Sequence, residues 1–270
     1  MSGFGDRLAE AVERRRSQVV LGLDPHPERI PDGVDAAEAF CAALIDAAGP
    51  ACVGVKIQLA CFERYGAPGW AAWERLAARA ADAGLLVIAD AKRGDIGISS
   101  AAYAAALLRE PVDAVTVNPM LGDDGVAPFI AAAEAGGRGV FALVRTSNPG
   151  AAALQDLPLA AGGLWHEALA ALVAGWGEPS VGVSGLSAVG AVVGATVPER
   201  IGRLRDLMPR QPFLIPGVGA QGGQVADLGP AFAPGPGGGL VAASRSLMFA
   251  DDPARAAEEL RQAVAAVAGG

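Results

Sequence analysis

The sequence is poor in the side chains that bind metals or form disulfides. Its 270 residues include only 3 cysteines, Cys41, Cys52 and Cys61, which form no CxxC pair, and 2 histidines, His26 and His166, which stand far apart. This spacing argues against a structural zinc site and against a disulfide framework. Free thiols are typical of the reducing cytosol, so we expect a cytoplasmic protein without a bound metal.

The sequence also lacks long apolar runs and a basic stripe. No stretch approaches the roughly 18 uninterrupted apolar residues that a membrane span needs, and the N-terminal segment lacks the apolar core of a signal peptide. The net charge of −8 argues against nucleic-acid binding, which needs a basic surface. It remains compatible with a small anionic substrate, because a pocket can be positive within an acidic protein.

Lysine is nearly absent. Only Lys56 and Lys92 are lysines, and every other member of the set of 21 basic residues is an arginine. Both lysines lie at the ends of apolar runs. Arginine stays protonated, whereas a buried lysine can release a proton. Lysines kept only at such positions therefore indicate proton chemistry.

Apolar runs that alternate with helical patterns dominate the chain, and hydrophobic residues make up 52% of it. Eight runs predict parallel strands buried on both faces, at Val19–Leu23, Val53–Ile57, Leu85–Ala89, Ala114–Val117, Val140–Val144, Val181–Val183, Phe213–Ile215 and Leu240–Ala243. Between and after them we expect helices, including Ala36–Ala48, Trp70–Ala83, Ser99–Leu108, Leu164–Trp176, Ala188–Leu207 and Pro253–Val267. This pattern predicts a (β/α)8 TIM barrel forming one domain over residues 1–270.

Polar residues follow these strands directly, at positions that face one rim of a barrel. Active sites of such barrels are built there, at the carboxyl ends of the strands. The rim residues are Asp24, Lys56, Asp90, Lys92, Asn118, Arg145, Ser147, Ser184, Gln221 and Arg245. Two loops are rich in Gly and Pro. We interpret 147–163 as a candidate lid and 229–239 as plain connection.

Four charged residues of the rim form the central candidate site. Asp90 and Lys92 leave the strand end on one face, Asp95 follows after a turn, and Lys56 ends the adjacent strand. Alternating carboxylates and ammonium groups keep one another charged in a partly buried site. Such a site suits loss of a substrate anion followed by proton delivery from Lys92. A purely structural ion-pair network is the alternative, but the two rare lysines favour catalysis.

A second group of residues is typical of phosphate binding. Gly217 and Gly219 lie with Gln221 in a glycine-rich segment after the predicted seventh strand, and Ser244 and Arg245 end the eighth. Loops at these two places commonly hold a phosphate in barrels, because glycines let backbone N–H groups approach the oxygens. Arg245 can clamp two of those oxygens.

The remaining polar residues support two readings each. Asp24 can accept hydrogen bonds from sugar hydroxyls or simply form a turn before a proline. Ser99 can contact a ligand or cap a helix. The segment 146–149 can form a polar ring or an ordinary turn. We assign His26 to a turn and His166 to a helix surface, without partners.

Several of these segments match the motifs of one known family in the same order. The central match is to D-x-K-R-x-D-I, and the matches together span about residues 19 to 250. The chain thus resembles the orotidine 5′-phosphate decarboxylases, in particular their longer bacterial subgroup (type 2). The matching segments are Leu21–Asp24, Val55–Lys56, Asp90–Ile96, Asn118–Gly122, Thr146–Pro149, Pro216–Gln221 and Ser244–Arg245.

The resemblance implies decarboxylation of orotidine 5′-monophosphate (OMP) to uridine 5′-monophosphate (UMP) without metal or organic cofactor. It implies that Lys92 protonates C6 and that Asp90 lies against the departing carboxylate. Roles implied for other residues are ribose contact by Lys56 and Asp24, pyrimidine contact by Ser147, a bridge between base and phosphate by Gln221, and phosphate binding by Arg245. Asp95, Ile96 and Ser99 would reach the active site of a second subunit, which makes the working unit a homodimer.

Two alternatives stay open. A sister enzyme of the same barrel family would decarboxylate or cleave a keto-sugar phosphate with Mg²⁺, but Arg93-Gly94 and the Ser147 loop argue against it. A barrel that only binds nucleotides is the other alternative. Juxtaposed carboxylates gain little for mere binding, so the intact charged cluster argues against that reading too.

Overall fold

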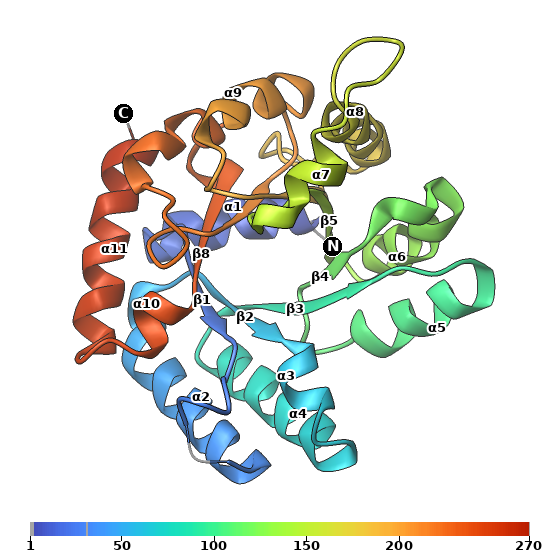
Figure 1. Ribbon diagram of the computed structural model, residues 1–270. Coiled ribbons are helices and arrows are strands. Elements are labelled where there is room, and N and C mark those ends of the chain that lie inside the picture. The colour runs from blue at the N-terminus through green and yellow to red at the C-terminus, as the bar shows by residue number, and fades with distance from the viewer. Residues whose placement is uncertain (1–2, 31, 270) are drawn as a thin grey trace.

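The computed structural model describes residues 3–30 and 32–269. All eight strands pair in parallel and in sequence order, and β8 pairs with β1 to close a barrel. Figure 1 shows the helices arranged around the outside of this barrel. The prediction of a (β/α)8 TIM barrel is confirmed. The strands are β1 (Val19–Leu23), β2 (Gly54–Gln58), β3 (Leu86–Arg93), β4 (Ala114–Val117), β5 (Gly139–Arg145), β6 (Val189–Val193), β7 (Phe213–Pro216) and β8 (Gly239–Ala243).

Helices follow most strands, but the connection from β7 to β8 is made by 3-10 turns. The longer helices are α1 (Phe4–Arg15), α2 (Val34–Ala48), α4 (Ala67–Asp82), α5 (Gly97–Leu107), α6 (Asp123–Ala135), α8 (Trp165–Gly177), α9 (Pro198–Leu207) and α11 (Pro253–Ala268). Short helices are α3 (Leu59–Glu63), α7 (Ala152–Gln155) and α10 (Arg245–Met248). The 3-10 segments are η1 (Gly49–Ala51), η2 (Pro119–Leu121), η3 (Pro149–Ala151), η4 (Glu178–Ser180), η5 (Val225–Phe232) and η6 (Pro236–Gly238). No helix in the described part of the chain is long and apolar enough to cross a bilayer.

The sixth strand lies later in the chain than the sequence predicts. Val181–Val183 is a loop, in which Val183 is fully exposed, and the strand is Val189–Val193. The helix expected over Ala188–Leu207 therefore contains this strand, and only its second half, from Pro198, is helical. The runs Val181–Val183 and Val189–Val193 are both short and apolar, so periodicity does not show which of them is the strand. Val189–Val193 is the strand because it pairs with β5 and β7.

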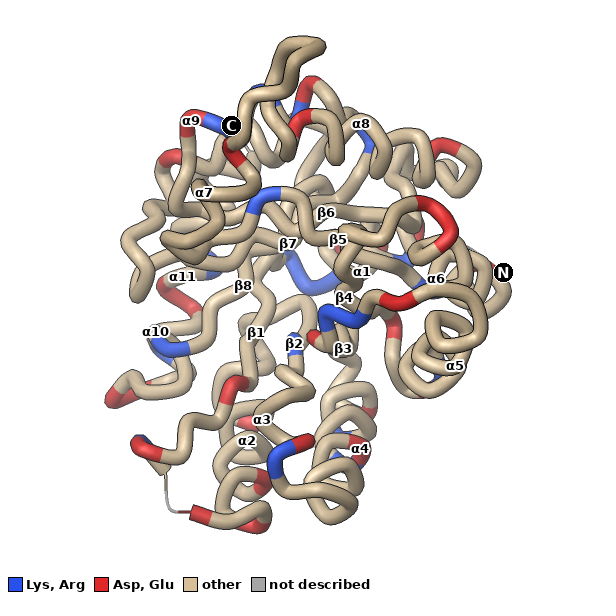
Figure 2. Tube along the Cα trace, turned by 45° about the vertical axis from the view of Figure 1, so that its right-hand side comes forward, with Lys and Arg blue, Asp and Glu red and all other residues tan. Residues whose placement is uncertain are grey.

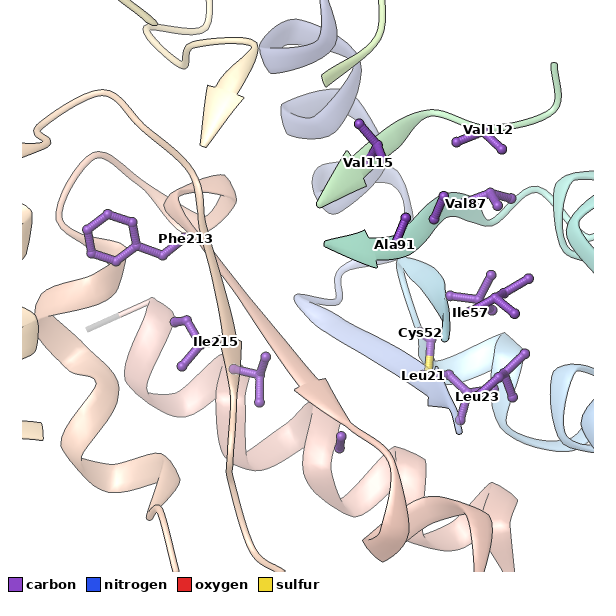
Figure 3. Close-up of a cluster of buried hydrophobic side chains, with 14 of the residues drawn as sticks. Leu21, Leu23, Cys52, Ile57, Val87, Ala91, Val112, Val115, Phe213 and Ile215 are labelled. Carbon is purple, nitrogen blue, oxygen red and sulfur yellow. The ribbon is translucent and has the colours of Figure 1, made fainter. Parts of the chain in front are cut away.

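The strands separate two buried layers. Side chains such as Leu21, Leu23 and Ile57 point outward and pack against the helices (Figure 3). Inward-pointing residues, among them Val20 and Ile88, fill the barrel itself. Helix α1 closes the end of the barrel at which the strands begin, with Phe4, Leu8, Ala11 and Val12 in the inner cluster. The opposite end, where the strands finish, is left open for a site.

Candidate active site

A cavity of about 910 Å³ opens at the carboxyl ends of the strands. Every strand, or the loop directly after it, contributes at least one residue to its wall. The wall includes nine residues that the sequence predicts as rim or site residues: Asp24, Lys56, Asp90, Lys92, Ser147, Gly217, Gln221, Ser244 and Arg245. The alternation of side chains along each strand explains this convergence, because inward positions that are apolar deep in the barrel become polar at its rim.

Asp90 is the centre of the charged cluster. It is buried, and its Oδ2 lies 2.6 Å from Lys56 Nζ, while its Oδ1 lies 2.5 Å from Lys92 Nζ. Lys56 Nζ also lies 3.3 Å from Asp24 Oδ1. Basic and acidic positions accordingly lie side by side near the labels of β2 and β3 in Figure 2. Lys56 is buried, but the Lys92 side chain is 43% exposed, so its ammonium faces the cavity.

The pKa values of Asp90 and Lys56 are shifted in the directions that favour their charged forms. Burial alone would raise the pKa of Asp90, but the charges and hydrogen bonds of Lys56 and Lys92 hold that pKa well below its usual range. Burial alone would lower the pKa of Lys56, but the carboxylates of Asp24 and Asp90 raise it above its usual range. The buried Asp90 carboxylate thus lies between the buried ammonium of Lys56 and the more exposed ammonium of Lys92.

Asp24 is fixed from both sides. Ser244 Oγ donates to Asp24 Oδ2 at 2.7 Å, and Lys56 binds the other oxygen. Gly22 makes this arrangement possible, because a Cβ at that position would lie 1.9 Å from Ser244 Oγ. The glycine of the Leu-Gly-Leu-Asp segment is therefore required by a close approach of two strands, which is one physical basis for that motif.

The opposite side of the cavity carries the glycine-rich segment and an arginine. Gly217 has a φ of +104°, in the region that favours glycine. It lines the cavity with Gln221 and with Arg245, which is exposed at the start of α10. Within the described residues, no carboxylate forms a salt bridge with Arg245. Its guanidinium is therefore available for an anionic ligand.

A buried network anchors the loop that carries Ser147. Arg145, predicted at the rim, instead points away from the cavity and binds Asp156 through Nε and Nη2 at 2.8 and 2.9 Å. His166, predicted on a helix surface, is buried, and its Nδ1 lies 2.8 Å from the carbonyl oxygen of Gln155 and 3.1 Å from Asp156. The predictions that Arg145 faces the cavity and that His166 lies on a helix surface were wrong. Their partners lie in the loop after β5, and the periodicity of a strand or helix does not predict contacts with a loop. The segment 147–163 folds into η3 and α7, and its role as a lid stays a prediction.

Three predicted site residues lie outside the cavity of their own chain. Asp95 accepts the backbone N–H of Ile96 at 2.8 Å rather than joining the charged cluster. Ile96 is 56% exposed, and Ser99 is exposed within α5. Ile96, not Ser99, is the N-cap of that helix, so the capping interpretation of Ser99 is wrong.

Three further predicted residues also do not line the cavity. Ser184 was predicted to follow the sixth strand at Val181–Val183, which is a loop, and its N–H binds Asp6 of α1 at the closed end of the barrel. Asn118 caps η2 by accepting from the N–H of Met120 at 3.1 Å. Gly219 forms the turn behind Gly217. The segment 224–239, now seen as η5 and η6, contributes nothing to the cavity wall.

Several further residues of the cavity wall were not predicted from the sequence. Gln58 donates to Asp90 Oδ2 at 3.2 Å, and Thr116 donates to Asp90 Oδ1 at 2.9 Å. The sequence contains an indication of each residue. Gln58 lies two residues after Lys56 and so shares its face of the strand, and Thr116 is the only polar residue in its strand. His26, predicted in a turn, and Arg29 also line the cavity, from the loop after β1. In the described ranges, no group of three or more His, Cys, Asp or Glu side chains is arranged to hold a metal ion.

Comparison with known proteins identifies the family. A model described as "Orotidine 5'-phosphate decarboxylase / HUMPS family" matches residues 17–260. The chain is 43% identical over 258 residues to an orotidine 5′-phosphate decarboxylase of Halorubrum lacusprofundi, covering 92% of this chain and 88% of that one. It is 40% identical over 275 residues to a protein of that name from Roseiflexus castenholzii, covering 97% of each.

Solved structures agree with the sequence relatives. The Leishmania donovani OMP decarboxylase superposes with a TM-score of 0.85 at 34% identity, covering all of both chains. A structure from Methanocaldococcus jannaschii, at a TM-score of 0.69 and 21% identity, shares the fold. With a family model over most of its length and relatives this similar, the chain belongs to the orotidine 5′-phosphate decarboxylase / HUMPS family.

Proposed function

We propose that this chain decarboxylates OMP to UMP and carbon dioxide, the last step of de novo UMP synthesis, and that it acts as a carbon–carbon lyase. The relatives at 38 to 43% identity carry the name of this enzyme. The observation that carries the proposal is the Asp90 carboxylate, held between two lysine ammonium groups in the wall of the cavity. We also infer that residues 1–270 form one barrel domain.

The distribution of groups around the cavity supports a single orientation of the substrate. Arg245 and the Gly217 segment bind the phosphate. Asp24 and Lys56 contact the ribose hydroxyls. Ser147, on the anchored loop, contacts the pyrimidine edge, and Gln221 bridges base and phosphate. With these contacts made, the carboxylate at C6 lies over Asp90 and Lys92.

The chemistry then follows from the charges. The bond between C6 and the carboxylate breaks, carbon dioxide leaves, and the electron pair stays on C6. The Lys92 ammonium, 2.5 Å from Asp90 Oδ1, gives a proton to that carbon, and the neutral lysine regains a proton from water. Asp90 disfavours a second carboxylate beside it, and this repulsion disappears when carbon dioxide departs. Lys56 holds Asp90 ionised throughout.

Decarboxylation is tested by the loss of ultraviolet absorbance when purified protein meets OMP in the presence of EDTA. Conversion to UMP under these conditions supports the substrate, the chemistry and the independence from metal together. If EDTA abolishes turnover and Mg²⁺ restores it, the keto-sugar-phosphate branch of the family becomes the better assignment.

Replacing Arg245 with alanine is expected to weaken binding of UMP by about 10- to 100-fold, because charge-assisted hydrogen bonds of about 1.5 to 3 kcal/mol are lost. The affinity for uridine, which lacks the phosphate, should change by less than about twofold, since every other contact stays. Isothermal titration of both ligands checks this. Equal losses for UMP and uridine would refute the assignment of Arg245 to the phosphate.

We also propose a homodimer in which Asp95, Ile96 and Ser99 complete the site of the partner. All three lie outside their own cavity, and apolar side chains are exposed beside them, with Ile96 56% and Ile98 90% exposed. An exposed apolar patch of this kind is typical of an interface. Asp95 would then supply a second carboxylate near the reacting carbon.

Mixing inactive Asp90→Asn and Asp95→Asn proteins tests this arrangement. A heterodimer would contain one site with both native carboxylates, so random mixing should recover about a quarter of the wild-type activity per site. The control is an equal mixture of two differently tagged Asp90→Asn proteins, which should stay inactive. No recovery in the first mixture, with heterodimers demonstrated by the tags, would place both carboxylates in one subunit's site.

A further inference from the structure

Thr116 connects the two central residues of the site by one hydroxyl group. It is 1% exposed and lies in β4 at the rim of the barrel. Its Oγ1 accepts the backbone N–H of Lys92 at 3.0 Å and donates to Asp90 Oδ1 at 2.9 Å. That carboxylate oxygen is the same one that Lys92 Nζ contacts at 2.5 Å. The backbone of one residue and the side chain of the other are thus tied together.

The backbone at Lys92 needs such support. Its φ of +48° lies in the left-handed region, which is unfavourable for a residue with a side chain. The register between β3 and β4 shifts between Ala89 and Arg93, so the regular strand pairing is interrupted at this point. The Lys92 N–H binds the Thr116 hydroxyl where a regular strand would offer a carbonyl. The side chain of Thr116 therefore completes the irregular turn of β3.

A hydroxyl can satisfy both neighbours because it has one proton and two lone pairs. Accepting from the Lys92 amide leaves the Thr116 proton free to point at Asp90, whose ionised carboxylate can only accept. The direction of both hydrogen bonds is fixed by this chemistry. Asp90 Oδ1 consequently has two donors, and its orientation relative to the Lys92 ammonium is determined by β4 as well as by β3.

We propose that Thr116 is a positioning residue, which holds the Lys92 backbone and the Asp90 carboxylate so that the ammonium lies where C6 receives its proton. This inference rests on the proposed decarboxylase function. Thr116 acts through the other two residues and does not exchange a proton with the substrate. A residue that merely fills the barrel would contribute its volume, and its hydroxyl would be dispensable.

The matched pair Thr116→Val and Thr116→Ser separates hydroxyl from volume. Valine keeps the shape and removes both hydrogen bonds, so kcat for OMP should fall by about 10- to 100-fold while KM changes by less than about threefold. Serine keeps the hydroxyl and loses a methyl, so kcat should stay within about threefold of the wild type. UMP affinity and melting temperature, measured on each variant, show that the cavity is intact.

Each outcome decides the proposal. If Thr116→Val keeps wild-type kcat, or if both variants lose kcat equally, the hydroxyl does not position the pair and the inference is wrong. Thr116→Ala removes the hydroxyl without adding atoms, and it replaces the valine variant should the latter fail to fold. A wild-type protein that does not decarboxylate OMP overturns the proposed function and this inference together, whereas an active wild type beside a fully active valine variant overturns the inference alone.

Discussion

Lys92→Ala is expected to lower kcat for OMP by about 10⁴-fold, the upper end of what a positioned general acid contributes. The variant loses the proton donor for C6 and also one of the two ammonium groups that face Asp90. UMP should still bind measurably, because the phosphate and ribose contacts lie on other strands. Single-turnover absorbance with OMP and titration with UMP measure the two effects separately.

Lys92→Arg distinguishes an acid from a simple counter-ion. Arginine keeps the positive charge near Asp90 but does not release its proton, so this variant should be inactive as well. Arg109→Ala is the surface control, since it removes one cation from an exposed pair with Glu74 and should leave kcat unchanged. Retained turnover in Lys92→Ala would remove Lys92 from the acid role.

Asp90→Asn should affect both turnover and stability. The substitution leaves the Lys56 ammonium buried without its nearest counter-ion, and breaking such a pair lowers the free energy of unfolding by about 3 kcal/mol. We expect kcat to fall by at least about 10³-fold, because the preorganised charge at the reacting carbon is lost. Denaturant unfolding and OMP turnover provide the two measurements.

The stability difference should depend on pH in a defined direction. The folded-state pKa of Asp90 lies well below its usual range, so the ionised carboxylate stabilises the fold above the unfolded pKa of about 3.9. That stabilisation disappears as the pH falls below this value. Wild type and Asp90→Asn should therefore differ most near neutral pH and converge in acid. The hydrogen bond from Arg79 also lowers the pKa of Asp46, but that pair is exposed, so Asp46→Asn should differ from the wild type much less than Asp90→Asn does at every pH. An equal effect of both substitutions would contradict the account.

The barrel could be predicted from the sequence because parallel strands buried on both faces leave continuous apolar runs. Seven of the predicted runs overlap strands of the structure, and the exception is instructive. Val181–Val183 and Val189–Val193 are similarly apolar, yet Val183 is fully exposed and only the second run pairs with β5 and β7. Pairing with distant strands determines which of the two runs becomes the strand, and local composition does not predict that pairing.

The charged part of the site was also predictable, whereas its supporting contacts were not. Lys56, Asp90 and Lys92 stand at strand ends, and the closure of the barrel brings strand ends together. Thr116 stands out as the only polar residue of β4, but no pattern in the sequence marks the irregularity of β3 through which it supports them. The burial of His166 depends on a loop that folds back from β5, which periodicity within one helix does not reveal. Such contacts are made between elements, so they follow from the tertiary structure.

The central claim is that this cavity decarboxylates OMP without a metal. In the most direct test, the purified, folded protein is incubated with OMP in the presence of EDTA, and the products are identified by chromatography. A parallel reaction contains a keto-sugar phosphate and Mg²⁺. The account predicts conversion of OMP to UMP and carbon dioxide in EDTA and no reaction of the sugar phosphate. Unchanged OMP together with turnover of the sugar phosphate would contradict it.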